Sequence, residues 1–232
     1  MEPTLALLPS PLLGPSVWQR VAAELKSNGW SVTTVPISPT APRTPEDVLQ
    51  TFLLAVPADR DVILVPHSNA GLYVPSLVRR GRVVGAVFVD AGLPPREGDV
   101  PLAPPAFFAS LAGKADADGL LPPWTSWWDE ADVAELFPNA AVRERVEREQ
   151  SRLPLSYFAA SLSVPLGWDD GLRGAYLAFG DTYGEDLESA ADRGWPTTTM
   201  PARHLHTLMD PAAVASELQA LLSTIGFPAA DE

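Results

Sequence analysis

The stretch "DVILVPHSNAG", residues 61–71, places four branched apolar residues before Pro66 and then sets His67, Ser68 and Asn69 in front of two small residues. This pattern is typical of a buried strand that runs directly into a helix, with the polar residue held on a sharp turn between them. Small residues after the turn allow the helix to approach the strand closely. Ser68 is therefore a candidate nucleophile, and the alternative is a serine that only caps the helix.

Short apolar runs alternate with segments of helical period along the chain, which predicts a mostly parallel central sheet with helices on both faces. The expected strands cover residues 4–8, 31–37, 61–65, 83–89, 175–179 and 197–200. The expected helices cover residues 16–28, 45–56, 69–80, 185–193 and 211–225, with Ser16, Thr44 and Asp210 as N-caps. The fold class is therefore α/β.

Residues 92–174, approximately, interrupt this alternation with a proline-rich segment that contains Trp124, Trp127 and Trp128. We interpret it as a mostly helical lid over the carboxyl edge of the sheet, inserted before the last two strands, with helices at 130–136 and 140–150. Residues 1–232 then form a single domain, because α/β domains of this length are common.

The composition excludes several classes of function. A net charge of -13 and a pI near 4.6 disfavour nucleic acid and anionic membranes, which both need clustered Lys and Arg. With no cysteine and three histidines, a disulfide framework or a metal site is not expected, and no cofactor is implied. No signal peptide and no apolar run of about 18 residues stands out, so we expect a cytoplasmic protein.

Three segments resemble the α/β-hydrolase superfamily, and within it the small lidded esterase and hydroxynitrile-lyase-like branch. "VPHSNAGLY" (65–73) looks like its nucleophile elbow, "LLPSPLLGPSVWQRVAAEL" (7–25) like its first strand, oxyanion loop and helix, and "RHLHTLMDPAAVASEL" (203–218) like its histidine loop and last helix. The resemblance implies an α/β-hydrolase fold and a triad in the chain order serine, acid, histidine.

The resemblance implies that His204 is the base, because the superfamily histidine usually lies seven residues before the proline that opens the last helix, here Pro211. A neutral imidazole suits proton transfer near neutral pH. His206 also follows the last expected strand, and we interpret it as a lid contact or a surface residue. His67 is expected to have a structural role.

The acid that orients the histidine has two candidate positions. Asp181 follows the strand at 175–179, where the superfamily usually places this residue, and its alternative role is that of an ordinary turn residue. Asp90 ends the preceding strand and is the alternative acid. Glu185 and Asp186 are weaker candidates.

The oxyanion site departs from the superfamily pattern. The Asn69 N–H opens a helix and is expected to be one donor. The position of the second donor falls on Pro11, which has no N–H. Either the Leu12 N–H or the Ser10 hydroxyl donates instead, or one donor is missing, which typically slows acyl transfer about 10²- to 10³-fold.

Aromatic residues crowd the expected lid and favour an apolar substrate, although they could equally hold the lid on the sheet. They include Trp124, Trp127, Trp128 and Tyr157, with Phe107, Phe108 and Phe158 nearby. The expected function is that of a serine hydrolase acting on a carboxylic ester, lactone or thioester of a small apolar molecule. The alternatives are a non-hydrolytic lyase or cyclase of natural-product biosynthesis, for which Pro11 argues, and a non-catalytic small-molecule-binding protein.

Overall fold

A central parallel sheet organises the computed structural model, which describes residues 3–40 and 43–228. Its six strands run in the order β2-β1-β3-β4-β7-β8, and every neighbouring pair is parallel. They are β1 (Thr4–Leu8), β2 (Val32–Thr34), β3 (Val62–Ser68), β4 (Val83–Ala91), β7 (Arg173–Phe179) and β8 (Thr197–Met200). The predicted α/β class is confirmed.

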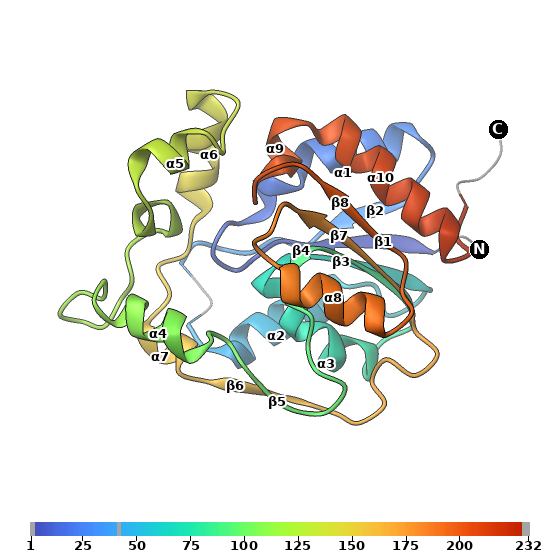
Figure 1. Cartoon of the computed structure of the whole chain (residues 1–232), viewed down its shortest axis with the longest axis horizontal. Helices are drawn as coiled ribbons and strands as arrows, with labels where there is room; N and C mark the ends of the chain where they lie inside the picture. The colour runs from blue at the N-terminus through green and yellow to red at the C-terminus, as the bar shows by residue number, and fades with distance from the viewer. Residues whose placement is uncertain (1–2, 41–42, 229–232) are drawn as a thin grey trace.

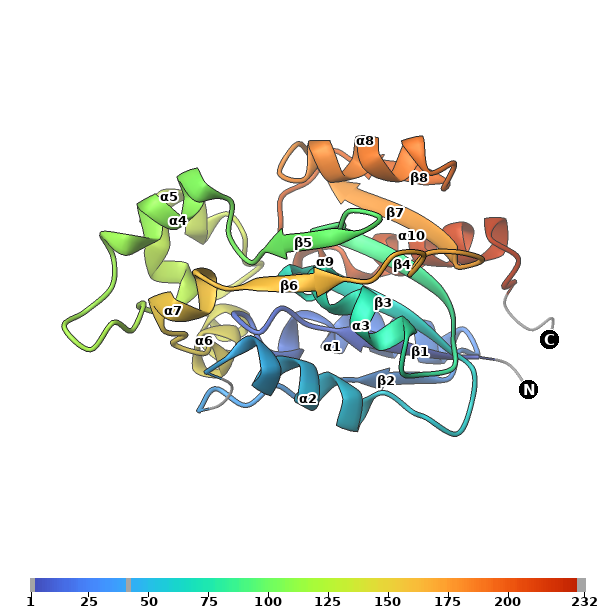
Figure 2. The same cartoon turned by 90° about the horizontal axis from the view of Figure 1, so that it is seen from below.

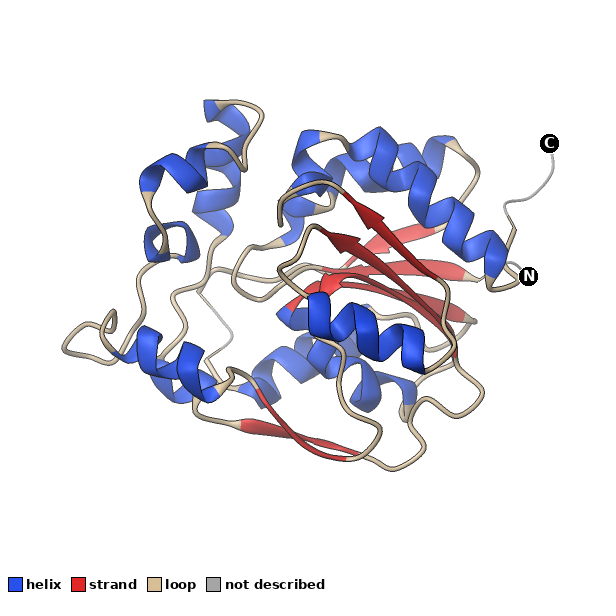
Figure 3. Cartoon of the chain, viewed as in Figure 1, coloured by secondary structure: helices blue, strands red, loops and turns tan. Residues whose placement is uncertain are grey.

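Helices cover both faces of the sheet, and Figures 1 and 2 agree on their distribution. One face carries α1 (Gln19–Ser27) and α10 (Pro211–Thr224), and the other carries α2 (Pro45–Ala55), α3 (Val74–Val78) and α8 (Gly184–Asp192). Figure 3 shows the strands between these two layers. Every residue of β1 and β3 is buried, as expected for central strands of a parallel sheet.

Two of the three expected helix caps are present. Thr44 forms a capping box with Asp47 at the start of α2, and the Asp210 carboxylate accepts a 3.0 Å hydrogen bond from the Ala213 N–H at the start of α10. The expected Ser16 cap is wrong. Ser16 lies inside a 3-10 turn, η1 (Pro15–Val17), and α1 begins only after Trp18.

The expected helix at 69–80 is divided into a 3-10 segment, η2 (Asn69–Tyr73), and the short helix α3. Pro75 gives the physical reason. It has no N–H with which to close an α-helical hydrogen bond to the carbonyl of Gly71, so the first turns stay tighter. The segment that follows Ser68 is therefore compact and close to the strand.

The insert, residues 92–172, connects β4 to β7 and lies beside the carboxyl ends of the strands (Figure 1). It contains α4 (Pro105–Ala112), η3 (Trp124–Trp127), α5 (Glu130–Ala134), α6 (Ala140–Glu149) and α7 (Leu155–Phe158). It also contains an antiparallel pair, β5 (Gly98–Pro101) and β6 (Ser161–Val164), which we did not expect from the sequence. Each strand has only four residues. β5 has no alternating pattern, and the Ser-Leu-Ser-Val of β6 is too short an alternation to indicate a strand.

Gly71 permits the close contact between the segment after Ser68 and strand β4. A Cβ atom at this position would lie 2.1 Å from the carbonyl oxygen of Gly92. We expect Gly71→Ala to lower the free energy of unfolding by about 1–3 kcal/mol, because the backbone must move to accept the methyl group.

Denaturant-induced unfolding measures this change, and Gly184→Ala is the matched control. No atom lies within 4 Å of a Cβ at Gly184, so its substitution should have little effect. Equal stability of the two variants would contradict the role given to Gly71.

Candidate active site

Ser68 lies on a strained turn at the carboxyl end of β3. Its backbone has φ 58° and ψ −132°, a region that residues other than glycine rarely adopt. Such strain costs of order 1–3 kcal/mol and is found most often at functional sites. The Ser68 side chain makes no capping hydrogen bond to η2, so the alternative interpretation as a simple cap does not fit.

Asp90 and His204 form a hydrogen-bonded pair next to this turn. His204 Nδ1 lies 2.6 Å from Asp90 Oδ2, and Asp90 is fully buried. The other carboxylate oxygen, Oδ1, accepts a 2.9 Å hydrogen bond from the Phe179 N–H at the end of β7. Because a carboxylate only accepts, the His204 proton lies on Nδ1, which leaves Nε2 able to take a proton.

Asp181, the residue first expected to be the acid, lies elsewhere. β7 ends at Phe179, and Gly180, with a φ of 64°, turns the chain so that Asp181 is exposed to solvent. Within the described residues its carboxylate makes no hydrogen bond or ion pair with His204. The structure therefore places the alternative candidate, Asp90, and not Asp181, against His204.

The two weaker candidates for the acid are also occupied elsewhere. Glu185 is exposed, and Asp186 Oδ1 accepts a 2.6 Å hydrogen bond from the Leu93 N–H. Burial raises the pKa of Asp186 to about 6. Neither carboxylate contacts the imidazole.

His67 holds the loop that carries His204. Its Nε2–H donates to the carbonyl oxygen of His204 over 3.0 Å, and the two rings stack with centroids 4.6 Å apart. Burial lowers the pKa of His67 well below its usual value, so the ring is neutral. His206 lies at the start of α9 (His206–Met209) and packs edge-on against Phe179.

Tyr183 contacts the candidate nucleophile directly, and the sequence analysis did not identify it. Its hydroxyl lies 3.2 Å from Ser68 Oγ, and its ring centroid lies 5.7 Å from that of His204. Among the described residues, Ser68 Oγ has no hydrogen bond with His204. The available signal was its place two residues after Asp181, in the loop at the carboxyl end of β7.

Asn69 places a backbone donor beside Ser68. It is the first residue of η2, so its N–H is one of those that a helix leaves without an internal acceptor. Its side chain is held on both sides. Oδ1 accepts a 2.8 Å hydrogen bond from the Tyr157 hydroxyl, and Nδ2 donates to the Leu102 carbonyl over 3.3 Å.

The loop after β1 folds around Ser10. The Leu13 and Gly14 N–H groups both donate to the Ser10 carbonyl, at 3.0 and 3.2 Å. The Leu12 N–H donates to Ser10 Oγ over a long 3.3 Å. Pro11 is buried in this loop and supplies no donor. The weakly bound Leu12 N–H and the Ser10 hydroxyl proton are the donors that this loop can offer.

The predicted aromatic residues divide into two groups. Trp124 lies with its ring centroid 5.9 Å from His204 and 6.0 Å from Trp128, which is 46% exposed. Trp127 packs against Phe158 and donates its indole N–H to the Pro122 carbonyl, so it stabilises the insert itself. Trp127 therefore has a structural role in the insert, while the contact of Trp124 and Trp128 with a substrate stays a prediction.

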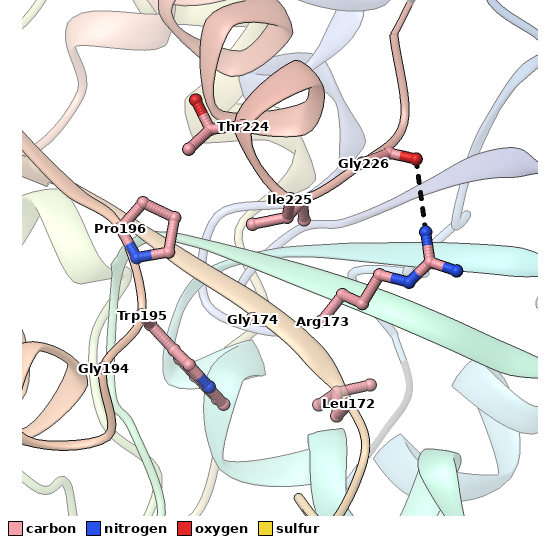
Figure 4. Close-up of a pocket in the computed structure, with 9 residues that line it drawn as sticks. All are labelled: Leu172, Arg173, Gly174, Gly194, Trp195, Pro196, Thr224, Ile225 and Gly226. Carbon is pink, nitrogen blue, oxygen red and sulfur yellow. Dashed lines mark hydrogen bonds between the residues drawn. The ribbon is translucent and has the colours of Figure 1, made fainter.

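A separate open hollow of about 520 Å³ lies at the amino end of β7 (Figure 4). It contains none of the predicted site residues. Its lining consists of Leu172, Arg173, Gly174, Gly194, Trp195, Pro196, Thr224, Ile225 and Gly226.

Residues 3–40 and 43–228 contain no group of three or more His, Asp or Glu side chains arranged to hold a metal ion. None of the described helices has the length and apolar character that crossing a bilayer requires.

Because Asp90 and not Asp181 contacts His204, we expect the reactivity of Ser68 to depend on the Asp90 carboxylate and not on that of Asp181. In Asp90→Asn the amide oxygen stays with the Phe179 N–H, so the NH₂ group faces His204 and favours the tautomer that cannot accept a proton from Ser68. We expect labelling by a fluorophosphonate to slow about 10³- to 10⁴-fold.

Asp181→Asn is the matched control and should label at the wild-type rate, because this side chain is exposed and apart from His204. The measurement is the second-order rate of covalent labelling, followed by mass spectrometry. A large loss in Asp181→Asn with no loss in Asp90→Asn would restore the first assignment.

The fold has close relatives among solved structures, although no family model and no curated protein matches the sequence. An extracellular α/β-hydrolase from a Paenibacillus species, described as similar in structure and function to tobacco salicylic acid binding protein 2, matches with a TM-score of 0.74 at 16% identity. The match covers 94% of this chain and 98% of that chain.

Two further structures match over 97% of this chain and 99% of their own. Polyneuridine aldehyde esterase has a TM-score of 0.66 at 18% identity, and tomato methylketone synthase I, in complex with 2-tridecanone, has 0.70 at 15%. Because one of the three neighbours is extracellular, the cytoplasmic location stays a prediction. At these identities the comparison establishes architecture: the chain has the α/β-hydrolase fold.

Proposed function

We propose that this protein is a serine esterase that cleaves a carboxylic ester, lactone or thioester of a small apolar molecule. The observation that carries the proposal is the buried Asp90–His204 hydrogen bond of 2.6 Å beside the strained turn at Ser68. His204 stacks on His67, the residue before Ser68, and so lies next to the turn. The esterase and hydrolase names of the structural neighbours support the same class.

The proposed reaction begins with attack of Ser68 Oγ on the substrate carbonyl carbon. The Ser68 proton moves to His204 Nε2, and the Asp90 carboxylate stabilises the imidazolium that forms. His204 then returns the proton to the departing alcohol or thiol, leaving an acyl group on Ser68. Water, activated by the same imidazole, releases the acid.

The developing negative charge on the carbonyl oxygen requires donors on the other side of Ser68. The Asn69 N–H is the first, and the long Leu12 to Ser10 hydrogen bond leaves Leu12 or Ser10 as the second. With Pro11 in the usual place of that donor, we expect this site to be weaker than one built from two free N–H groups.

The side chains near His204 support an apolar substrate. Trp124 and Trp128 lie together on the insert, and Trp128 is stacked with Phe107 at a centroid distance of 6.3 Å. A ring or acyl chain buried against such surfaces is stabilised by the hydrophobic effect. The net charge of -13 further favours a neutral ester over an anionic one.

A non-hydrolytic lyase or cyclase is the second candidate, and Pro11 favours it. One structural neighbour carries the name of a methylketone synthase, so the fold is not restricted to enzymes named as hydrolases. The binding-protein alternative is weaker, because a pure binding site has no need for a strained serine or a buried acid–histidine pair.

The first test replaces each proposed catalytic residue. Ser68→Ala should abolish fluorophosphonate labelling, and both Ser68→Ala and His204→Ala should reduce hydrolysis of p-nitrophenyl butyrate by about 10⁴- to 10⁶-fold. His206→Ala is the control and should keep most of the activity, because His206 packs against Phe179. A wild-type protein that binds apolar esters but is neither labelled nor active would point to the binding protein.

The second test concerns Pro11. Pro11→Ala and Pro11→Gly restore an N–H where the oxyanion site lacks one, so we expect faster hydrolysis of p-nitrophenyl acetate, by up to about 10²-fold. Thermal unfolding checks that the variants fold. Folded variants with unchanged or lower rates would mean that Leu12 or Ser10 already supplies the donor. Products without ¹⁸O after reaction in ¹⁸O-water would favour the lyase or cyclase.

A further inference from the structure

We infer that Tyr183 is a catalytic residue that donates a hydrogen bond to the oxygen of the leaving group. This inference rests on the proposed esterase function. It begins from the contact with the nucleophile, since the Tyr183 hydroxyl lies 3.2 Å from Ser68 Oγ. A group this close to Oγ is also close to the substrate carbon that becomes bonded to Oγ.

The order of the strands shows whether Tyr183 lies on the same side of Ser68 as the oxyanion donors or as the base. Leu12 follows β1 and Asn69 follows β3, while Asp90 lies near the end of β4, Tyr183 follows β7 and His204 follows β8. In the sheet order β1-β3-β4-β7-β8, the oxyanion donors therefore lie on one side and the base lies on the other. Tyr183 shares the side of the base, and its ring lies 5.7 Å from that of His204.

The geometry of the tetrahedral intermediate connects this placement to the leaving group. The carbonyl oxygen and the leaving oxygen are bonded to the same carbon and point in different directions. When the carbonyl oxygen faces Asn69 and Leu12, the leaving oxygen faces His204, which must protonate it. A donor beside His204 therefore meets the leaving oxygen and not the oxyanion.

Tyr183 keeps its proton in this position. Burial, together with the negative charges of Asp90 and Asp186, raises the pKa of the Tyr183 phenol. A neutral phenol can donate a hydrogen bond but does not act as a base near neutral pH. Among the described residues this hydroxyl makes a hydrogen bond only with Ser68 Oγ, so it can turn to the substrate.

Breakdown of the tetrahedral intermediate needs no further reactant. As the bond between carbon and leaving oxygen breaks, its electron pair goes to that oxygen, which takes the proton from His204 Nε2. Tyr183 donates a hydrogen bond while charge builds up and retains its own proton. The products are acyl-Ser68, neutral His204 and the free alcohol.

Tyr183→Phe tests this role because it removes only the hydroxyl. We would measure kcat/KM, which reports on the steps through acylation, for ethyl, phenyl and p-nitrophenyl butyrate, which share one acyl group. The poorest leaving group needs the donor most. We expect a loss of about tenfold or more for ethyl butyrate and less than about twofold for p-nitrophenyl butyrate.

Tyr73→Phe is the matched control. The Tyr73 hydroxyl is also buried and bonded to another hydroxyl, that of Tyr157 at 2.7 Å, but it does not contact Ser68. Its variant should keep the wild-type ratio of the three kcat/KM values, which separates a leaving-group effect from a general loss of a buried phenol.

Three results would overturn the inference. These are an equal loss for all three esters, which would place Tyr183 at the oxyanion or in a structural role, no loss for any of them, or the same change of ratio in Tyr73→Phe. Failure of the esterase proposal itself looks different, because then neither the wild-type protein nor Tyr183→Phe would be labelled by a fluorophosphonate. Thermal unfolding of Tyr183→Phe confirms that the comparison is made on folded protein.

Discussion

Two strained residues on neighbouring strands set the geometry of the site. Ser68 (φ 58°) and Asp90 (φ 42°) are the non-glycine residues with positive φ in the described part of the chain. Ser68 is the last residue of β3 and Asp90 the last but one of β4, two strands that are paired in the sheet, and the Gly92 N–H donates to the Ser68 carbonyl over 3.1 Å. Backbone strain of this kind persists only when surrounding contacts compensate for it. Here the compensation comes from the β3–β4 ladder and from the close contact between Gly71 and Gly92.

The insert is bonded to three of the segments that bear the site, those after β1, β3 and β8. Glu149 of α6 accepts hydrogen bonds from the Ser16 N–H and hydroxyl, at 2.8 and 2.6 Å, and so holds the end of the loop after β1. Tyr157 of α7 holds the side chain of Asn69, and Glu135 beside α5 forms an ion pair with Arg203, next to His204. Movement of the insert would therefore be transmitted to the oxyanion donors and to the base.

The sequence was sufficient for the parts of the site that depend on local pattern. The alternation of apolar runs with helical segments predicted the sheet, and the residues around Ser68 predicted the turn. The histidine loop was implied by the resemblance to the α/β-hydrolase superfamily. The choice between Asp181 and Asp90 depended on three-dimensional direction. Gly180 turns Asp181 towards solvent, while the positive φ of Asp90 directs its carboxylate to His204. The sequence "VFVDAG" predicts only that Asp90 is a polar residue near the end of a strand, and it does not indicate the direction of the side chain.

Contacts between distant segments were harder still to predict. Tyr183 reaches Ser68 across 115 positions of sequence, and Glu149 reaches Ser16 across 133. The pair β5 and β6 is equally non-local, and its four-residue strands are too short for an alternating pattern to indicate them. Composition and periodicity predict which face of a helix or strand is buried, but they do not predict which other segment of the chain packs against that face.

Hydrogen-bond donors are distributed unevenly around the proposed nucleophile. On the side of the oxyanion, Pro11 removes one N–H and Leu12 is partly occupied by Ser10. On the side of His204, the half-buried and neutral phenol of Tyr183 lies beside the imidazole. Donors lower the barrier only where charge develops in the transition state. Under the proposed mechanism, an acyl transfer limited by departure of a poor leaving group gains most from the second side, and we therefore expect the natural substrate to be an ester of an aliphatic alcohol.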